Sequence, residues 1–534
     1  MSDILPQGLS ASEFKAALDA FRKIVGARWV IVEPTEGLNS YRDQYSPRPA
    51  SFFLASAAVA PDSVEQIQQI LKVANDYGIP LWTVGAGRNL AYGGAAPREN
   101  GYVVLDLKRM NRILEVNEQY GYALLEPGVT YFELYRYLQD RGHKLWIDCA
   151  APGWGSVVGN ALEHGVGYTP YGEHFTMSCG MEVVLANGEV VRTGMGALPG
   201  NNTWQLFKYG FGPFVDGLFT QSNFGVVTKM GVWLMPEPPG VTPFMITYQN
   251  EDDLHAITER LRPLKVNSII PNGAVTAHAI WEASVQVTRS QYYDGDGPMP
   301  ESNLRRMIED LDIGIWNFYG AVYGPPPVME AGLSVVRDAL LSIPGAKMYL
   351  EEDRKGDGAF VYRAELMRGV PNMTEFGIVN WTGGGAHLDF SPVSPTTGDD
   401  AMKQFHMIRD RAREFGFDYV GEFAVGWREM HHIFMIVYDT MDDDEKSRAR
   451  ELFSVLVREA AAEGYGEYRT HLEFMDDIAA TYDWNDGALW DFHETIKDAL
   501  DPNGILSPGK MGIWPKRMRD AHPRKGASSG DSDA

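Results

Sequence analysis

The sequence predicts an α+β protein of at least two domains. Its 534 residues, 44% of them hydrophobic, can bury a large core and exceed what one domain normally holds. As far as Leu234, helical and strand patterns alternate with glycine-rich loops, an arrangement of α/β character. After Pro236, which opens the stretch PEPP, strands alternate with longer helices, which indicates a second domain with a mostly antiparallel sheet.

The first half contains three amphipathic helices, each with a recognisable start. Apolar side chains recur at helical spacing after Ser12, a possible cap. A second helix follows Asp62 or Ser63, either of which can cap it. Thr130 and Glu133 form the capping box of the third helix. Short apolar runs predict strands at 81–84, 102–107, 122–125, 181–185, 190–193 and 223–234.

The second half alternates strands with helices. Strands are predicted at 242–248, 314–322 and 346–350, and helices at 251–261, 302–311 and 328–341. This order is typical of an antiparallel sheet covered by helices. Residues 524–534 are small and polar, and we expect them to be disordered.

Two glycine-rich stretches in the first half favour a phosphate-bearing cofactor. The stretch from Val84 to Ala96 reads VGAGRNLAYGGAA, and its glycines let backbone N–H groups converge on a pyrophosphate. Its spacing matches neither the dinucleotide fingerprint nor the P-loop, so a tight turn region is an equally good interpretation of this stretch alone. A second block, residues 153–172, offers Ser156 and Asn160 as donors. Two such loops in one domain favour a long, extended cofactor over a mononucleotide.

Two places in the second half carry acidic or imidazole groups in apolar surroundings. Three glycines precede His387 on a short predicted strand, and strand alternation puts His387 and Asp389 on one face. A lone strand histidine is usually structural, so this pattern alone does not establish a site. Glu422 lies in the apolar run DYVGEFAVG, where a carboxylate either faces solvent or is buried for a reason.

Two further pairs of neighbouring side chains need an interpretation. His431 and His432 point to opposite faces of a strand, so they do not form a metal pair, and we expect both to be structural. No other pattern predicts a metal site. Tyr468 followed by Arg469 places a phenol donor beside a fixed cation, which can bind an anion or pack where two domains meet.

Composition excludes several classes of function. A formal net charge of −24 and a pI near 4.9 leave no basic stripe for a nucleic-acid partner. Two cysteines, Cys149 and Cys179, exclude a disulfide scaffold and fit a reducing compartment. The N-terminal residues lack a signal-peptide pattern, and no stretch approaches a membrane span of about 20 apolar residues. We therefore expect a cytoplasmic protein without a membrane partner.

Motifs along essentially the whole chain resemble the vanillyl alcohol oxidase and p-cresol methylhydroxylase flavoprotein family, especially its bacterial eugenol and 4-alkylphenol oxidases. These motifs are NLAYGGAAPR, GYALLEPGVTY, GWGSVVGN, GVGYTPYG, NGEVVRTGMGALPG, QSNFGVVTKMG, WNFYG, REMHH, GYGEYRTH and DPNGI. Their order and number make the resemblance far more diagnostic than any one of them.

The resemblance implies a two-domain FAD-linked oxidase fold. Residues 1–238 would form the FAD-binding domain, residues 239–464 a cap domain over the isoalloxazine ring, and residues 465–534 would return to the first domain. Membership also implies a homodimer or a higher homo-oligomer. The residues expected to bind FAD are Val84, Gly85, Ala86, Gly87, Arg88, Asn89, Leu90, Ser156, Gly159, Asn160, Tyr171, Gly172, Gly225, Val227 and Lys510.

The resemblance also implies the catalytic roles. His387 occupies the position at which the oxidases of this family attach the flavin 8α-methyl covalently. Tyr92, Tyr468 and Arg469 match a clamp that holds a phenolic substrate as phenolate, because a cation and two hydrogen bonds favour the charged form. The remaining residues expected around the substrate are Ala151, Val166, Asp389, Ala424 and Trp427.

One departure from the family pattern concerns the catalytic base. Family oxidases carry an aspartate near flavin N5, whereas this chain has Ala151 in the matching segment CAAPGWG. Glu422 aligns instead with a glutamate of p-cresol methylhydroxylase. We hypothesise that the base has moved across the substrate to Glu422. Asp389 is the rival base, unless its carboxylate is simply solvated.

The implied reaction is hydride transfer from the benzylic carbon of a para-substituted phenol, such as 4-ethylphenol, eugenol or vanillyl alcohol, to flavin N5. The quinone methide product then takes up water or loses a proton to give an alkene, while dioxygen is reduced to hydrogen peroxide. A dehydrogenase that passes electrons to a cytochrome is the alternative, and His387 with the missing signal peptide favours the oxidase. A non-catalytic flavin-binding protein is a second alternative.

Overall fold

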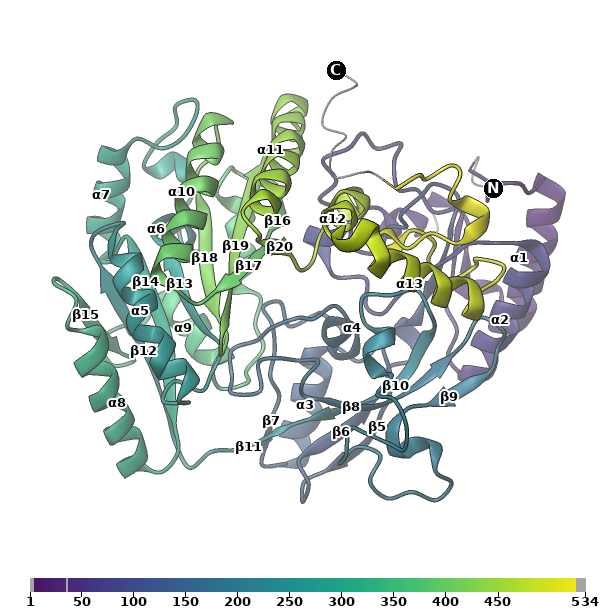
Figure 1. Cartoon of the computed structure of the whole chain (residues 1–534), viewed down its shortest axis with the longest axis horizontal. Coiled ribbons are helices and arrows are strands. Elements are labelled where there is room, and N and C mark those ends of the chain that lie inside the picture. The colour runs from purple at the N-terminus through teal and green to yellow at the C-terminus, as the bar shows by residue number, and fades with distance from the viewer. Residues whose placement is uncertain (1–3, 35–36, 525–534) are drawn as a thin grey trace.

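The computed structural model describes residues 4–34 and 37–524, and it has two parts that lie side by side (Figure 1). Of residues 524–534, which we predict to be disordered, 525–534 lie outside this range. In Figure 1 the part built from the N-terminal and C-terminal residues lies on the right, and the middle of the chain forms the part on the left.

The N-terminal part begins with a four-stranded sheet in the order β1-β2-β4-β3. The pairs β2–β4 and β3–β4 are parallel, and helices α1 and α2 pack against each other on this sheet. Its elements are α1 (Ala11–Val25), β1 (Val30–Ile31), β2 (Ala57–Val59), α2 (Val64–Tyr77), β3 (Leu81–Val84) and β4 (Val103–Asp106).

A five-stranded antiparallel sheet in the order β5-β6-β10-β8-β9 completes the N-terminal part. A two-stranded pair, β7 with β11, lies where the chain leaves for the middle part. The elements are β5 (Ile113–Asn117), β6 (Tyr122–Leu125), α3 (Tyr131–Arg141), β7 (Leu145–Trp146), α4 (Val157–Leu162), β8 (Ser178–Val184), β9 (Val190–Arg192), β10 (Val226–Trp233) and β11 (Met235–Pro236).

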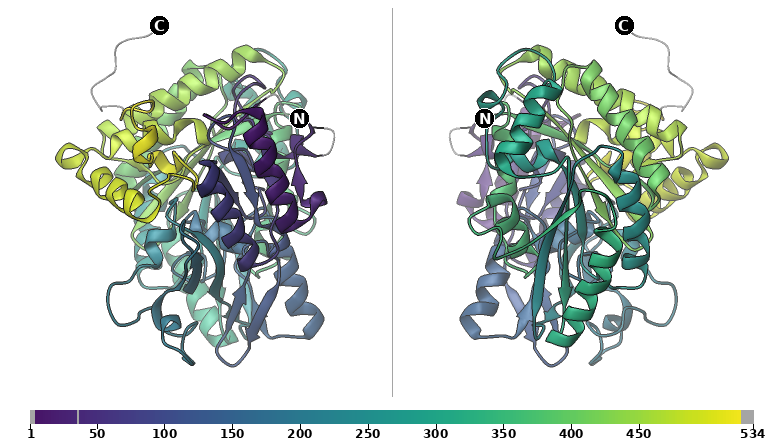
Figure 2. Two further views of the ribbon diagram at one scale, coloured as in Figure 1. Left: turned by 90° about the vertical axis from the view of Figure 1, so that its right-hand side faces the viewer. Right: turned by 90° about the vertical axis from the view of Figure 1, so that its left-hand side faces the viewer.

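The middle part is a nine-stranded antiparallel sheet in the order β15-β12-β14-β13-β18-β19-β17-β20, with β16 also pairing with β19. Helices α5, α8 and α10 pack beside one another along it, on the side away from the N-terminal part (Figures 1 and 2). The strands are β12 (Val241–Tyr248), β13 (Ala274–His278), β14 (Trp316–Tyr323), β15 (Lys347–Leu350), β16 (Ala386–Phe390), β17 (Pro392–Pro395), β18 (Val420–Val425), β19 (Glu429–Tyr438) and β20 (Gly466–Glu467). The helices are α5 (Asp253–Val266), α6 (Ala279–Ser284), α7 (Glu301–Leu311), α8 (Pro326–Leu340), α9 (Gly358–Leu366), α10 (Gly398–Glu414) and α11 (Asp443–Ala462).

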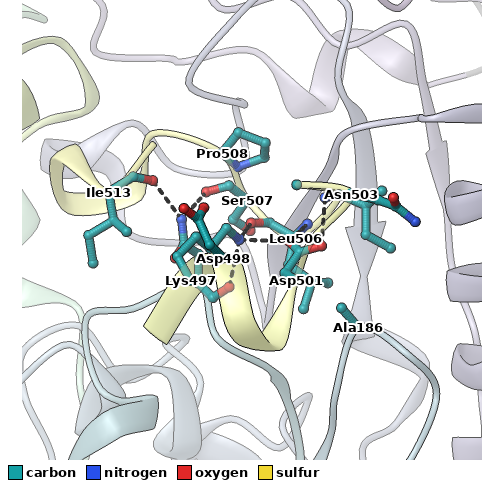
Figure 3. A network of polar contacts seen from close by, with 12 residues as sticks. Ala186, Lys497, Asp498, Asp501, Asn503, Leu506, Ser507, Pro508 and Ile513 are labelled. Carbon is teal, nitrogen blue, oxygen red and sulfur yellow. Dashed lines mark hydrogen bonds and ion pairs between the residues drawn. The ribbon is translucent and has the colours of Figure 1, made fainter. Parts of the chain in front are cut away.

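The C-terminal residues return to the N-terminal part as α12 (Met475–Thr481) and α13 (Trp484–Leu500), followed by a segment beside β3 (Figure 1). Figure 3 shows how this segment is fixed: the buried Nζ of Lys497 donates to the carbonyl oxygen of Leu506 at 2.7 Å and pairs with Asp501 at 2.7 Å. Asp501 in turn accepts the backbone N–H groups of Ile505 and Leu506. The segment is thereby held next to the strand that leads into the glycine stretch.

The helix starts follow the local sequence rules, with one correction. The capping box of Thr130 and Glu133 is present, and Ser63 caps α2. The predicted cap Ser12 is wrong, because α1 is capped by Ser10. The Ser10 hydroxyl accepts from the N–H of Glu13, whose carboxylate reaches back to the Ser10 N–H.

Candidate active site

Two adjoining cavities run from the glycine stretch of the N-terminal part to the sheet of the middle part. The first has a volume of about 220 Å³ and the second about 690 Å³. They share a wall formed by Arg88, Asn89, Tyr92, Pro152, Asn160 and Arg469. The predicted cofactor stretch and the predicted catalytic tyrosine and arginine therefore border one continuous space.

Two glycines in the wall of the first cavity leave no room for a side chain. A Cβ on Gly85 would lie 3.1 Å from the carbonyl oxygen of Pro127, and Gly87 has a φ of +64°, which favours glycine. Twelve of the predicted cofactor residues line this cavity: Val84, Gly85, Ala86, Gly87, Arg88, Asn89, Ser156, Gly159, Asn160, Gly225, Val227 and Lys510. Leu90 and Gly172 line the second cavity, and Tyr171 lines neither. The narrow, glycine-walled shape fits a long cofactor whose pyrophosphate approaches the main chain.

Ser156 does not act as the free donor that the sequence suggested. Its hydroxyl donates to the carbonyl oxygen of Pro127 at 2.6 Å and accepts from the N–H of Gly159 at 2.8 Å, so it is the cap of α4. Ser156 shapes the cavity wall by fixing this helix start, while its single proton is already engaged.

Tyr92, Tyr468 and Arg469 meet in the second cavity. Tyr92 ends a 3₁₀ turn (Leu90–Tyr92), and the guanidinium carbon of Arg469 lies 4.4 Å from the centre of its ring and 5.3 Å from that of Tyr468. The Tyr468 hydroxyl and the Arg469 Nε are buried and have no hydrogen-bond partner among the described residues. Buried polar groups normally find partners, so these atoms are poised for an anionic or phenolic ligand.

The electrostatics of this group suit phenolate binding. Burial raises the pKa of Tyr468, and the charge of Arg469 opposes that rise. Burial also holds the pKa of Tyr92 well above its usual value. Both hydroxyls therefore keep their protons at neutral pH and can donate them, next to a permanent cation.

His387 and Asp389 form a buried pair on β16. His387 Nδ1 lies 2.5 Å from Asp389 Oδ1, both residues line the second cavity, and the ring of Tyr45 meets the imidazole edge at a centroid distance of 5.2 Å. The prediction that they share a strand face is confirmed, and a solvated Asp389 is wrong because the residue is only 7% exposed. Since Nδ1 is engaged by the carboxylate, Nε2 is the ring nitrogen left for other chemistry.

Glu422 is buried, on β18, and lines the same cavity. Arg363 donates from Nη2 to its carboxylate at 3.2 Å. Burial raises the pKa of Glu422 to about 8, and the neighbouring Glu375 carboxyl adds to the rise. Glu422 thus presents a carboxyl group that can hold or release a proton near neutral pH.

Glu375 and His431 line the second cavity, and neither was assigned to the site from the sequence. Glu375 lines the cavity, accepts the hydroxyl of Tyr168 at 3.2 Å, and has a pKa that burial raises to about 7. Its segment is a 3₁₀ helix (Thr374–Asn380), which gives no periodic signal in the sequence. His431 also lines the cavity, where its ring lies edge-on to that of Tyr468 at a centroid distance of 4.5 Å, whereas His432 is fully buried against Tyr419. The expectation that both histidines are purely structural therefore describes His432 better than His431.

The remaining predicted pocket residues complete the wall. Ala151, Val166, Ala424 and Trp427 all line the second cavity, and Trp427 is half exposed. Ala151 contributes a methyl group, and no carboxylate, to this wall. Within residues 4–34 and 37–524, no cluster of side chains is suited to hold a metal ion. The same residues include no helix that is long and apolar enough to cross a membrane.

Comparison with known proteins places this geometry among flavin enzymes. Residues 55–194 match the family described as FAD binding domain, and residues 391–511 match FAD linked oxidases, C-terminal domain. The chain is 43% identical over 512 residues to the 4-cresol dehydrogenase [hydroxylating] flavoprotein subunit of Pseudomonas putida, covering 96% of this chain and 98% of that protein.

Two solved structures agree with the fold over nearly the whole chain. P-cresol methylhydroxylase with substrate bound has a TM-score of 0.94 and 43% identity, covering 96% of this chain and 99% of its own. The 4-ethylphenol oxidase of Gulosibacter chungangensis, in its isoeugenol complex, has a TM-score of 0.94 and 44% identity, covering 96% and 100%.

Proposed function

The chain belongs to the vanillyl alcohol oxidase and p-cresol methylhydroxylase family of FAD-linked oxidoreductases, and from this premise we propose that it oxidises para-substituted phenols with dioxygen as electron acceptor. The predicted two-domain α+β fold of this family is confirmed. The observation that carries the proposal is the meeting of Tyr92, Tyr468 and Arg469 in a cavity that continues into the glycine-walled space.

The two cavities fit FAD. In this proposal the glycine stretch Val84–Asn89 would hold the pyrophosphate, with Lys510, which pairs with Glu163, in the same wall. The shared wall that contains Tyr92 and Arg469 would border the flavin ring. When bound, FAD supplies the two-electron acceptor for the benzylic carbon and passes the electrons on to dioxygen.

The side chains of the protein contribute to the oxidation by keeping the substrate oxygen ionised. Tyr468 and Tyr92 donate hydrogen bonds to that oxygen, and Arg469 supplies the charge that keeps it ionised. A phenolate pushes electrons through its ring toward the para position, so loss of the benzylic hydride leaves a neutral quinone methide. The apolar surroundings strengthen these interactions, because few water molecules compete for the charged groups.

The base for the second step is assigned to Glu422. It accepts a proton from the water that adds to the quinone methide, since Ala151 cannot. Asp389 is a poorer candidate because its carboxylate is already engaged by His387 Nδ1. Glu422→Gln should reduce the yield of alcohol relative to alkene while leaving single-turnover flavin reduction intact, whereas Asp389→Asn should leave the product ratio unchanged. An unchanged ratio in Glu422→Gln would reject the assignment.

His387 is proposed as the covalent flavin attachment site through its Nε2. A covalent bond raises the reduction potential of the flavin and so favours hydride acceptance. Acid precipitation should leave the flavin on the wild-type protein and release it from His387→Asn, with the surface variant His143→Asn as control. Full release of flavin from the wild type would contradict this assignment.

An oxidase and a dehydrogenase differ in the acceptor that takes the electrons from the substrate, which is dioxygen in the first and a cytochrome in the second. The 44% identity to a 4-ethylphenol oxidase and the histidine at position 387 support the oxidase, whereas the 43% identity to 4-cresol dehydrogenase supports a cytochrome-coupled enzyme as the second candidate. Turnover of 4-ethylphenol in air should yield one peroxide per substrate oxidised, with no added acceptor. Substrate oxidation only after a cytochrome c is added would favour the dehydrogenase.

A further inference from the structure

A buried charge cluster lies behind the wall of the second cavity. Arg363 of α9 is fully buried, as is Glu282 of α6, and Glu422 of β18 is 3% exposed. Glu375, in the 3₁₀ segment beside α9, adds a third carboxyl. Among the described residues that ion-pair with these carboxyls, Arg363 is the one cation. The cluster therefore has more acids than its guanidinium can neutralise.

Arg363 is shared unequally between two of these acids. Its Nη1 lies 2.5 Å from Glu282 Oε1, while its Nη2 lies 3.2 Å from Glu422 Oε2. The second oxygen of Glu282 accepts the hydroxyl of Tyr319 at 2.6 Å. The guanidinium carbon also lies 4.4 Å from the ring centre of Tyr319, which keeps it on the Glu282 side. Arg363 therefore pairs more closely with Glu282 than with Glu422.

The charge balance follows from this geometry. An unpaired charge is costly to bury, so one guanidinium supports one carboxylate and the other acids keep their protons. Burial raises the pKa of Glu282, and this rise is opposed by Arg363 and by the hydrogen bond from Tyr319. Burial raises the pKa of Glu375 to about 7 and that of Glu422 to about 8, and the Glu375 carboxyl adds to the rise at Glu422.

Further titratable groups face the cluster from the elements packed against it. Asp357, the cap of α9, and Asp389 of β16 each add negative charge that favours protonated neighbours. Tyr168 donates to Glu375, and Tyr362 and Tyr419 stay neutral because burial holds the pKa of each well above its usual value. None of these groups supplies a second cation.

We propose that Glu282 is a positioning residue for catalysis: by occupying Arg363 it withholds that cation from Glu422, so that Glu422 carries an exchangeable proton at the cavity wall. The proposal rests on the assignment of Glu422 as the base that takes a proton from water. If an arginine paired directly with Glu422, its charge would keep the Glu422 carboxylate ionised and lower its affinity for a proton. The Glu282–Arg363 pair instead leaves Glu422 a proton affinity matched to near-neutral pH.

The experiment uses 4-methylphenol and the holoenzyme. The quinone methide of this substrate has no hydrogen on a neighbouring carbon, so it can form only an alcohol. The rate of alcohol formation, measured beside the rate of flavin reduction in the same turnover, therefore reports water addition. Rapid-quench single turnovers from about pH 6 to about pH 9.5 should show a rise with a midpoint near the Glu422 pKa of about 8. Glu282→Gln frees Arg363 for Glu422 and should lower this midpoint by about one pH unit, a roughly tenfold shift in proton affinity.

Two further variants keep the test decisive. Tyr319→Phe removes the donor that helps Glu282 stay ionised, and it should move the midpoint in the same direction by less. If Glu282→Gln does not fold, the pH midpoint of Tyr319→Phe tests the role of Glu282 in its place. Glu182→Gln is the matched control, because Glu182 is also a buried, ion-paired glutamate but lies on β8, outside the cavity. Its midpoint should equal that of the wild type.

The outcomes separate this inference from the proposed function. A midpoint unchanged in both Glu282→Gln and Tyr319→Phe, with flavin reduction intact, overturns the role of Glu282 while the proposed function stands. If wild-type flavin is not reduced by 4-methylphenol or any other 4-alkylphenol, the proposed function fails first. A shift of the same size in Glu182→Gln would also overturn the inference, because general destabilisation would then explain it.

Discussion

The guanidinium of Arg469 lies between two tyrosine rings, and its Nε and the hydroxyl of Tyr468 have no hydrogen-bond partner among the described residues. A fold that only needed to pack these groups would have satisfied them. The raised pKa of Tyr468, caused by burial, keeps its hydroxyl proton available for donation. At the scale of single residues, the site is therefore built to receive a negative oxygen.

This arrangement predicts the ionisation state of a bound phenol. 4-Hydroxybenzaldehyde, which absorbs differently as phenol and as phenolate, should bind the wild type as phenolate below its solution pKa. Tyr468→Phe should weaken binding roughly 10- to 100-fold, because one hydrogen bond to a charged group is worth about 1.5–3 kcal/mol. The control Tyr465→Phe removes a hydroxyl that bonds to Asp400 outside the cavity. Equal spectra and affinities in both variants would contradict the clamp.

At the scale of elements, the C-terminal segment after α13 is as important to the cofactor cavity as the glycine stretch. Ser507 and Lys510 line that cavity. The Ser507 N–H donates to the carbonyl oxygen of Leu81 in β3, and the Leu81 N–H donates to the carbonyl oxygen of Ile505. The side chains of Ile505 and Leu506 pack into the core of the N-terminal part, and buried polar contacts hold the main chain of the segment. Its position depends on the fully buried pair of Lys497 and Asp501 (Figure 3).

Lys497→Met should therefore loosen both the fold and the cofactor. Removing one partner of a buried pair costs about 3–5 kcal/mol, because the other charge stays buried. We expect a lower thermal midpoint, loss of FAD on gel filtration of a non-covalent His387→Asn background, and faster proteolysis after residue 500. Lys72→Met is the control, since that lysine forms only a surface ion pair. Equal FAD retention in the two variants would argue against this role.

The adjoining strands β18 and β19 contain a buried histidine that makes the stability of the fold sensitive to acid. Burial lowers the pKa of His432 to about 3, and the neutral ring accepts a contact from Tyr419 at 2.6 Å. A lowered histidine pKa stabilises the fold above the unfolded pKa of about 6.5, and this stability is lost as the pH falls toward 3. Each pH unit between about 6.5 and about 3 lowers the free energy of unfolding by about 1.4 kcal/mol.

His432→Gln removes this titration while keeping a hydrogen-bond acceptor for Tyr419. Between pH 7 and pH 5 the wild type should lose about 2 kcal/mol more unfolding free energy than the variant. Urea unfolding at the two pH values measures the difference. Parallel losses in both proteins would show that His432 does not titrate in this range.

At the scale of the whole molecule, the sequence predicts elements well where one local rule decides them. The capping box at Thr130 and the strand at 81–84 follow from neighbouring residues, whereas the Ser12 cap is wrong because a better box lies two residues earlier. The meeting of Tyr92 with Tyr468 depends on the return of the chain, which periodicity does not encode. The family resemblance supplied that contact.

The buried charge cluster could not be predicted from sequence patterns, for a related reason. Glu282, Arg363 and Glu422 come from three separate elements, and their pairing is a product of sheet order. A lone arginine within the apolar helix GAFVYRAEL was the one signal that a buried cation needed an acid partner. Nothing in the sequence identified which acid that would be.

The central claim is that a phenolic oxygen, ionised by Tyr92, Tyr468 and Arg469, drives reduction of the flavin. Anaerobic mixing of the holoenzyme with 4-ethylphenol or with its methyl ether, followed by flavin absorbance, tests this claim most directly. The account predicts full bleaching by 4-ethylphenol and none by the ether, which cannot ionise. Equal bleaching by both compounds, or none by any 4-alkylphenol, would contradict it.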